Sequence, residues 1–139
     1  MQYDRVYYEM IVNKIVDSFK TVFGDDMLLL NRYFSFEHMG YFKISYKYQP
    51  CDYDIIFENE KNIFTIQICD SEGAKTNLYR IQSYNNRLEI ENIQEALLKL
   101  KTVLEVNDMC FYIYKGDKLY KKKGQEYKRI KDLSEITGR

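Results

Sequence analysis

The 139-residue sequence has no tryptophan, one proline and one histidine, and its charges cancel. Because 21 basic residues balance 21 acidic ones, no overall field draws the chain to nucleic acid or to an anionic membrane. The single histidine, His38, excludes a metal site built from several histidines. The six glycines are scattered and form neither a G-x-G nor a G-K-[ST] motif, which excludes the common phosphate-binding loops.

Cysteines and long apolar runs are also scarce. Cys51, Cys69 and Cys110 are an odd number without a C-x-x-C pair, which argues against a disulfide framework. The N-terminal residues lack the basic, apolar and small-residue order of a signal peptide. The longest apolar run, Met109 to Tyr114, is far shorter than the roughly 20 residues of a membrane-spanning helix. We therefore expect a soluble protein of the reducing cytoplasm.

What the sequence does contain is typical of a folded chain. Hydrophobic residues make up 45% and charged residues 30%, with 14 tyrosines and eight phenylalanines. No internal repeat, linker or low-complexity segment divides the chain. Residues 1–139 therefore predict a single domain with one core.

Two stretches have helical periodicity. In residues 3–23 apolar side chains recur at three- and four-residue steps, and Gly24 ends the pattern. Residues 91–106 repeat the same spacing, and Asn92 with Glu95 resembles a capping box at the start. The sequence therefore predicts an N-terminal amphipathic helix and a second helix after the middle of the chain.

Alternation of apolar and polar residues predicts strands in between. The expected strands are residues 27–36, 41–48, 54–58, 63–69 and 78–83. Short connections favour antiparallel pairing of neighbours, and a Gly116-Asp117 turn predicts a hairpin near the C-terminus. The predicted fold is α+β: an N-terminal helix, an antiparallel meander of about four to five strands, a second helix and a C-terminal β-hairpin.

Carboxylates gather around the third and fourth predicted strands, with Asp70 and Glu72 following. Ordinary surface polarity explains them, and so does a docking surface for a basic partner. Tyrosines suit an interface because each offers a large apolar ring with a polar tip. Tyr46 and Tyr48 are in phase with the apolar residues of their strand, so they suit the core equally. The candidate partner-binding residues are Tyr46, Tyr48, Asp52, Tyr53, Asp54, Glu58 and Glu60.

The C-terminal part is basic, with nine basic and four acidic residues from Lys115 to Arg139. Tyrosines that stack on bases and lysines that contact phosphates are usual in single-strand binders. Alternation splits this charge, since Lys118, Tyr120 and Lys122 share one face, and lysines also protect exposed hairpins from aggregation. The residues of this alternative are Tyr112, Tyr114, Lys115, Lys118, Tyr120, Lys121, Lys122, Lys123, Lys128 and Arg129.

A third alternative is a divergent metal-dependent nuclease. Such enzymes hold a hard cation with an Asp and a nearby Glu or Gln, and a Lys two residues later stabilises charge at the phosphate. Asp54 and Gln67 fit the first two positions, whereas Cys69 stands where the Lys is needed. A thiol supplies no fixed positive charge. Alternating polar residues on a half-exposed hairpin explain the same pattern without catalysis.

A small chain of this composition, rich in Tyr, Ile, Asn and Lys, resembles the immunity proteins that bacteria encode beside polymorphic or contact-dependent toxins. The resemblance is general and rests on no motif. It implies a non-catalytic protein that binds a cognate toxin and blocks its active site or its substrate access. We therefore expect a protein-binding module without cofactor or metal, which inhibits a basic toxin domain such as a nuclease and docks through residues 46–60.

Overall fold

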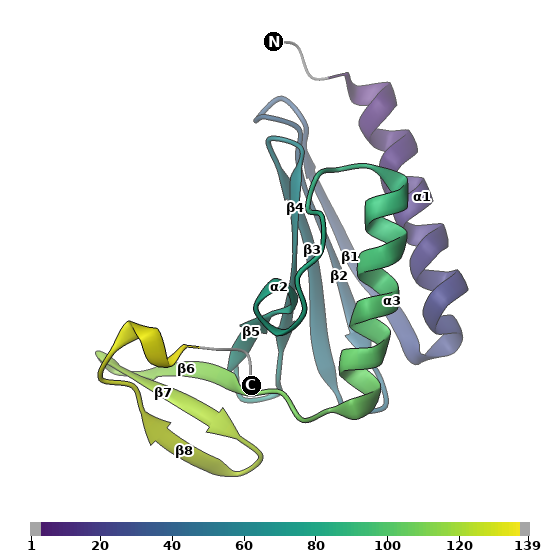
Figure 1. Ribbon diagram of the computed structural model, residues 1–139. Coiled ribbons are helices and arrows are strands. Elements are labelled where there is room, and N and C mark those ends of the chain that lie inside the picture. The colour runs from purple at the N-terminus through teal and green to yellow at the C-terminus, as the bar shows by residue number, and fades with distance from the viewer. Residues whose placement is uncertain (1–3, 137–139) are drawn as a thin grey trace.

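Two long helices lie side by side on one face of an antiparallel sheet, and neither covers the opposite face (Figure 1). The structure is a computed structural model that describes residues 4–136. Its elements in chain order are α1 (Arg5–Phe23), β1 (Met27–Ser35), β2 (Tyr41–Tyr48), β3 (Tyr53–Glu60), β4 (Ile63–Cys69), β5 (Lys75–Asn77), α2 (Leu78–Ile81), α3 (Ile90–Val106), β6 (Phe111–Lys115), β7 (Lys118–Lys123) and β8 (Glu126–Arg129). Short 3-10 turns occupy Gly24–Asp26 and Leu133–Glu135.

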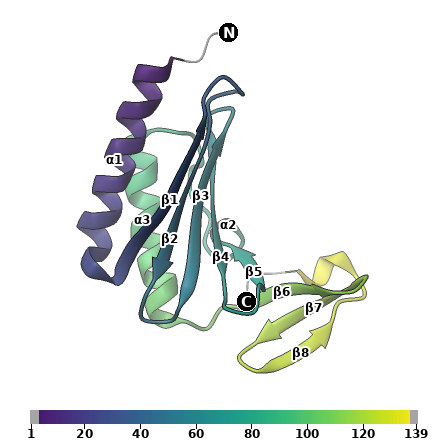
Figure 2. The ribbon, with the colours of Figure 1, turned by 180° about the vertical axis from the view of Figure 1, so that it is seen from behind.

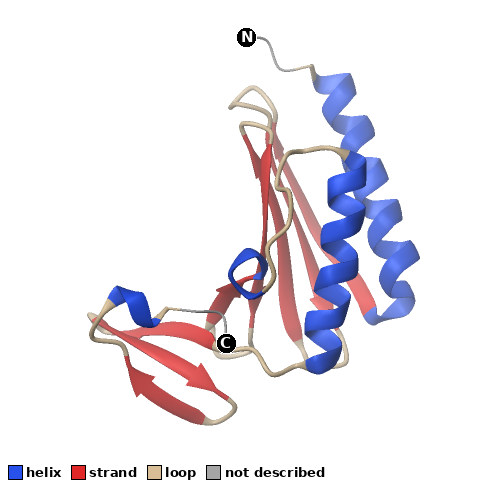
Figure 3. Cartoon of the chain, in the orientation of Figure 1, coloured by secondary structure: helices blue, strands red, loops and turns tan. Residues whose placement is uncertain are grey.

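The described strands form one eight-stranded sheet in chain order, and each neighbouring pair is antiparallel. A single residue pair, Lys75 with Tyr112, joins β5 to β6. At this junction the sheet turns, so that β6 to β8 project on the side opposite the long helices (Figure 2). Figure 3 shows the resulting layers, with helices on one side of the main sheet. The predicted α+β class is confirmed.

The first helix agrees with its sequence pattern. The Asp4 carboxylate caps it by accepting hydrogen bonds from the backbone N–H groups of Val6 (2.9 Å) and Tyr7 (3.4 Å). Gly24 ends it with a φ of +58°, and its N–H donates to the carbonyl of Lys20. The predicted start at residue 3 lies outside the described residues. Among those described, no helix is both long and apolar enough to cross a membrane.

The second predicted helix is α3, but its predicted capping box is wrong. The helix begins at Ile90, so Asn92 lies inside it and cannot be its N-cap. The Asn92 amide instead donates to the Arg87 carbonyl and to the Glu89 carboxylate, each at 3.2 Å. Asn107 in the left-handed region (φ +52°) ends the helix.

The predicted strand at residues 78–83 is also wrong. Residues 75–77, expected in a loop, form the short strand β5, and α2 follows at Leu78. Asn77 starts this helical turn because its side-chain oxygen accepts the Tyr79 N–H at 3.0 Å. The chain then follows the edge of β4, where the Phe64 N–H donates to the Asn86 carbonyl at 2.9 Å. Tertiary pairing and an Asn cap thus override the alternation of the side chains.

The other strands lie within a few residues of their predicted positions, and the predicted Gly116-Asp117 turn joins β6 to β7. The C-terminal hairpin has a third strand, β8, after a turn at Gly124 (φ +61°). The meander and the C-terminal hairpin belong to one sheet.

Stacked aromatic rings cross the sheet on its helix-covered face. The Phe57 ring centroid lies 6.2 Å from that of Phe42 and 5.0 Å from that of Phe64, with nearly parallel planes. Phe19 of α1 meets Phe57 edge-on at 6.4 Å, and Tyr84 extends the row beyond Phe64 at 5.3 Å. Because burying one such side chain contributes about 1.5–3 kcal/mol, this row is a large part of the stability.

Gly40 brings the two hairpin turns and α1 together at one end of the sheet. Its φ is +73°, and a Cβ there would lie 2.5 Å from the ring of the buried Tyr8. The Tyr8 hydroxyl donates to the Asn62 side-chain oxygen in the β3–β4 turn at 2.5 Å. The Gly40 carbonyl accepts from the buried Asn59 amide at 2.9 Å. Residue 40 therefore has no space for a side chain.

We expect Gly40→Ala to lower the free energy of unfolding by about 3 kcal/mol, since positive φ costs about 1–2 kcal/mol and overpacking a similar amount. Gly116→Ala is the matched control, because Gly116 also has positive φ (+67°) but no atom near its missing Cβ. It should cost about 1 kcal/mol. Urea unfolding followed by circular dichroism measures both. Equal losses would show that the Tyr8 contact is not tight.

Candidate binding surfaces

The long helices leave one face of the main sheet uncovered (Figure 1), and we call it the open face. In β2 every second residue from Phe42 to Tyr48 is buried, so the intervening residues point to the open face. The same alternation in β3 directs Asp54, Ile56 and Glu58 outwards. The candidates Asp54 and Glu58 therefore share this face with Lys43 and Lys47 of β2.

Tyr46 and Tyr48 belong to the core and not to this surface. Their side chains are 3% and 6% exposed. The Tyr46 ring stacks on Phe19 of α1 with a centroid distance of 4.1 Å, and Tyr48 meets Phe23 edge-on at 6.2 Å. Burial raises the pKa of the Tyr46 hydroxyl above its ordinary value. Both residues therefore correct the set proposed from the sequence.

Tyr53 is half-buried and connects β3 to other elements. Its hydroxyl donates to the Asn107 side chain at the end of α3 at 2.7 Å, and its ring packs against Phe111 at 5.3 Å. Burial is the main cause that raises its pKa. A partner that used this ring would have to break these contacts.

Asp52 and Asp54 both bind Lys47. The Lys47 ammonium lies 3.2 Å from the Asp52 carboxylate and 2.8 Å from that of Asp54. Hydrogen bonds to Asp54 and then to Asp52 raise the pKa of Lys47. This part of the open face is therefore closer to neutral than the sequence suggested.

Glu58 and Glu60 lie at the other end of β3, close to Tyr41 and Tyr33, which were not among the residues predicted from the sequence. The Tyr41 hydroxyl donates to Glu58, and burial, with that hydrogen bond, raises the pKa of Tyr41 to about 12. The rings of Tyr41 and Tyr33 lie 6.0 Å apart. Tyr33, Tyr41, Glu60 and Glu37 line one shallow cavity of about 510 Å³. We call Tyr33, Glu37, Tyr41, Glu58 and Glu60 the acidic end of the open face.

The acidic end could not be found from sequence spacing. Its members come from β1, the following turn, β2 and β3, which pairing brings together. Cations offset part of this charge: Lys43 lies opposite Glu58 in the register, and exposed His38 lies 4.0 Å from the Glu37 carboxylate. A backbone hydrogen bond lowers the pKa of Glu37, and the charge of Arg5 also helps to lower it. The sequence feature that could have indicated Tyr33 and Tyr41 is the alternation in their strands, which places both on the face opposite the core residues.

The basic hairpin does not present all its predicted residues to solvent. Lys122 is 7% exposed, and its ammonium lies 2.6 Å from Asp70 and 3.0 Å from Glu72. The Tyr127 hydroxyl also donates to Glu72. Burial alone would lower the pKa of Lys122, but its two carboxylate partners prevail and raise it. Lys122 is therefore an internal cation, which corrects its assignment to phosphate binding.

Tyr112 is also buried, at 7% exposure, so the structure does not offer it as a stacking platform. The Lys115 ammonium lies 3.8 Å from the ring centroid of Tyr127, a cation–π contact within the C-terminal extension, our name for strands β6 to β8. Tyr120 is partly buried. The exposed candidates are Tyr114, Lys115, Lys118, Lys123, Lys128 and Arg129, whereas Lys121 is partly buried. They lie on different faces, as alternation predicted.

The residues of the nuclease alternative do come together. Asp54 pairs with Cys69 in the register, and the Cys69 thiol lies 3.7 Å from the Gln67 side-chain oxygen. Burial is the main cause that raises the pKa of this thiol. Asp54 is bound to Lys47. Within residues 4–136, no group of three or more His, Cys, Asp or Glu side chains is arranged to hold a metal ion.

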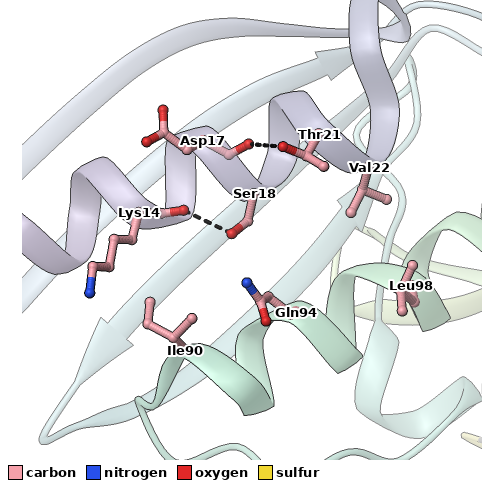
Figure 4. A pocket seen from close by; sticks show the side chains of 8 residues that line it. All are labelled: Lys14, Asp17, Ser18, Thr21, Val22, Ile90, Gln94 and Leu98. Carbon is pink, nitrogen blue, oxygen red and sulfur yellow. Dashed lines mark hydrogen bonds between the residues drawn. The ribbon is translucent and has the colours of Figure 1, made fainter.

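A groove of about 570 Å³ runs between the solvent-facing sides of α1 and α3 (Figure 4). The Ser18 hydroxyl donates to the Lys14 carbonyl at 2.8 Å, and the Thr21 hydroxyl to the Asp17 carbonyl at 2.9 Å. These hydroxyls are thus used within α1. Lys14 and Asp17 carry opposite charges, so the groove favours neither an anion nor a cation.

Comparison with protein-family models, with curated proteins and with solved structures finds no match to this chain. The resemblance to immunity proteins therefore stays a prediction.

The Lys122 network gives a test of what holds the C-terminal extension in place. We expect Lys122→Gln to lower the free energy of unfolding by about 2 kcal/mol, because it leaves the buried Asp70 carboxylate without its cation. Lys123→Gln, at the exposed neighbouring position, should change it by less than about 0.5 kcal/mol. Urea unfolding measures both, and equal effects would contradict the buried pair.

The loss of unfolding free energy in Lys122→Gln should depend on pH. Hydrogen bonds from the Tyr127 hydroxyl and then from Lys122 lower the pKa of Glu72. The stability that ionised Glu72 contributes is therefore fully present above the ordinary carboxyl pKa, and it is lost as the pH falls through the lowered pKa. The gap between the wild type and Lys122→Gln should therefore narrow towards about pH 3.

Proposed function

We propose that this chain is a non-catalytic protein-binding module that inhibits a basic toxin domain and docks through the acidic end of its open face. The observation that supports it best is the meeting of Glu37, Glu58 and Glu60 with the rings of Tyr33 and Tyr41 on a face without a helix cover. This moves the contact region from the predicted residues 46–60 towards one end of the sheet.

The side chains of the acidic end suit a protein interface. Tyr33 is 54% exposed, so its ring can bury a large apolar area at little entropic cost. Tyr41 is positioned by its hydrogen bond to Glu58, which reduces the ordering needed on binding. A rigid sheet behind these side chains keeps their spacing. The surface thus combines aromatic anchors with charge.

The charge favours a basic partner. Three carboxylates converge here, whereas Asp52 and Asp54 further along the face are bound to Lys47. Opposed potentials speed association and exclude partners of like charge. A nuclease toxin, whose substrate is a polyanion, would offer such a basic surface, and covering it would block access of the substrate. The immunity-protein resemblance implies the same outcome.

We expect the inhibitor to act in the cytoplasm. The three cysteines are free thiols, with Cys110 buried and Cys51 and Cys69 partly buried. Free thiols persist in a reducing compartment.

The test is a tagged pull-down from the source cells, with nuclease-treated and untreated lysates compared by mass spectrometry. We expect one basic protein in stoichiometric amount that survives nuclease treatment. Glu58→Lys with Glu60→Lys should weaken its binding at least tenfold in a titration with the purified partner, because two attractive charges become repulsive.

The matched control is Glu91→Lys with Glu95→Lys, which makes the same charge change at exposed positions of α3. It should retain binding within about twofold, since rim charges far from a contact contribute little. Equal loss in both variants, or no loss in either, would show that the partner does not use the acidic end. Circular dichroism and unfolding check that both variants fold.

A further inference from the structure

A second concave site lies where the sheet turns between β5 and β6, at the end of the open face away from the acidic end. A cavity of about 590 Å³ occupies this corner, and its lining includes Gln67, Lys75, Asn77, Arg80, Tyr112 and Tyr114. Figure 1 shows the corner between the main sheet and the projecting strands β6 to β8. Cavities of roughly 300–1,000 Å³ are typical of small-molecule sites.

Strand register places several of these residues on one face. Asn77 lies opposite Gln67, and Lys75 lies opposite both Cys69 and Tyr112. Residues that are paired directly across an antiparallel ladder point to the same side of the sheet. Tyr114, two residues beyond Tyr112 in β6, also lines the cavity. Residues far apart in sequence thus share one cavity.

The charge of this cavity is of one sign. Lys75 and Arg80 are exposed, and within residues 4–136 neither forms an ion pair. Among the described residues that line the cavity there is no Asp or Glu. Lys47 and Lys122, by contrast, each bind two carboxylates. The two cations of the corner are therefore left for an anion from outside.

The amides of the lining add donors. The Asn77 side-chain oxygen already accepts the Tyr79 N–H at 3.0 Å, and the Gln67 oxygen lies 3.7 Å from the Cys69 thiol. Each amide also carries an NH₂ group, which is a donor that a ligand can use. Ammonium, guanidinium and amide donors together suit phosphate oxygens.

An aromatic surface completes the site. Tyr114 lines the cavity and is 67% exposed, which leaves its ring available for stacking. Base–aromatic stacking contributes about 1–3 kcal/mol per base. We propose that this corner binds a nucleotide, with Lys75 and Arg80 at the phosphate and Tyr114 against the base. The same chemistry is supplied by a free mononucleotide or by the end of a single strand.

This site differs from the basic hairpin suggested by the sequence. Its cations come from β5 and α2, and of the hairpin residues named there it uses Tyr112 and Tyr114 but none of the lysines. It also does not depend on the proposed toxin partner, because it lies at the other end of the face. Loss of one activity would leave the other measurable.

The test is calorimetric titration of the full chain with ATP and, separately, with a 5′-phosphorylated ten-nucleotide single strand, at fixed salt. We expect saturable binding that falls at least tenfold in Lys75→Gln with Arg80→Gln. The control, Lys118→Gln with Lys128→Gln, removes two exposed charges outside the cavity and should stay within about twofold. Tyr114→Ala should weaken binding about fivefold or more, and Tyr114→Phe should preserve it.

Each outcome either supports the proposed nucleotide site or overturns it. If ATP and the strand bind alike and both depend on the cavity variant, the ligand is a mononucleotide. If only the strand binds, with the same dependence, the ligand is a strand end. Equal loss in the cavity and control variants would reduce the interaction to diffuse electrostatics and overturn the site. Absence of saturable binding of either probe, or no effect of Tyr114→Ala, would overturn the nucleotide assignment.

Discussion

The stacking of Phe57 between Phe42 and Phe64, with Phe19 of α1 against it, is the contact on which the other features depend. It holds three adjacent strands and the first helix to one another in the buried core. Because side chains alternate along a strand, burial of this face sends the intervening residues to the other. A shift of one residue in β3 would bury Asp54 and Glu58 and expose Phe57. The core register therefore decides which polar groups are accessible.

The uncovered face that results has two chemically different ends. At one end the two hairpin turns meet around Gly40, and the acidic end forms beside them. At the other end the sheet turns, and Lys75 and Arg80 line the corner. Between them Lys47 binds both Asp52 and Asp54 and offsets part of their charge. The zero net charge of the chain thus conceals two separated regions of opposite sign.

The turn of the sheet is stabilised by buried charge. Only one residue pair connects β5 with β6, so the ladder by itself would hold the C-terminal strands weakly. Lys122 of β7 reaches Asp70 and Glu72 in the loop before β5, and Tyr127 of β8 donates to the same Glu72. These contacts hold the extension against the main sheet. The shape of the corner cavity depends on them, although none of the four residues lines it.

The sequence by itself determined the α+β class, the two long helices, most strands and the Gly116-Asp117 turn, because these follow from local periodicity and backbone preference. It did not predict α2, where a cap on Asn77 outweighs the alternation of the following residues. Strand pairing and tertiary packing determined which side chains are buried and which of them meet. Tyr46 went to the core, Lys122 met two carboxylates, and Tyr33, Tyr41 and Glu58 were gathered from three strands. Binding surfaces depend on contacts between distant residues, and only the tertiary structure creates those contacts.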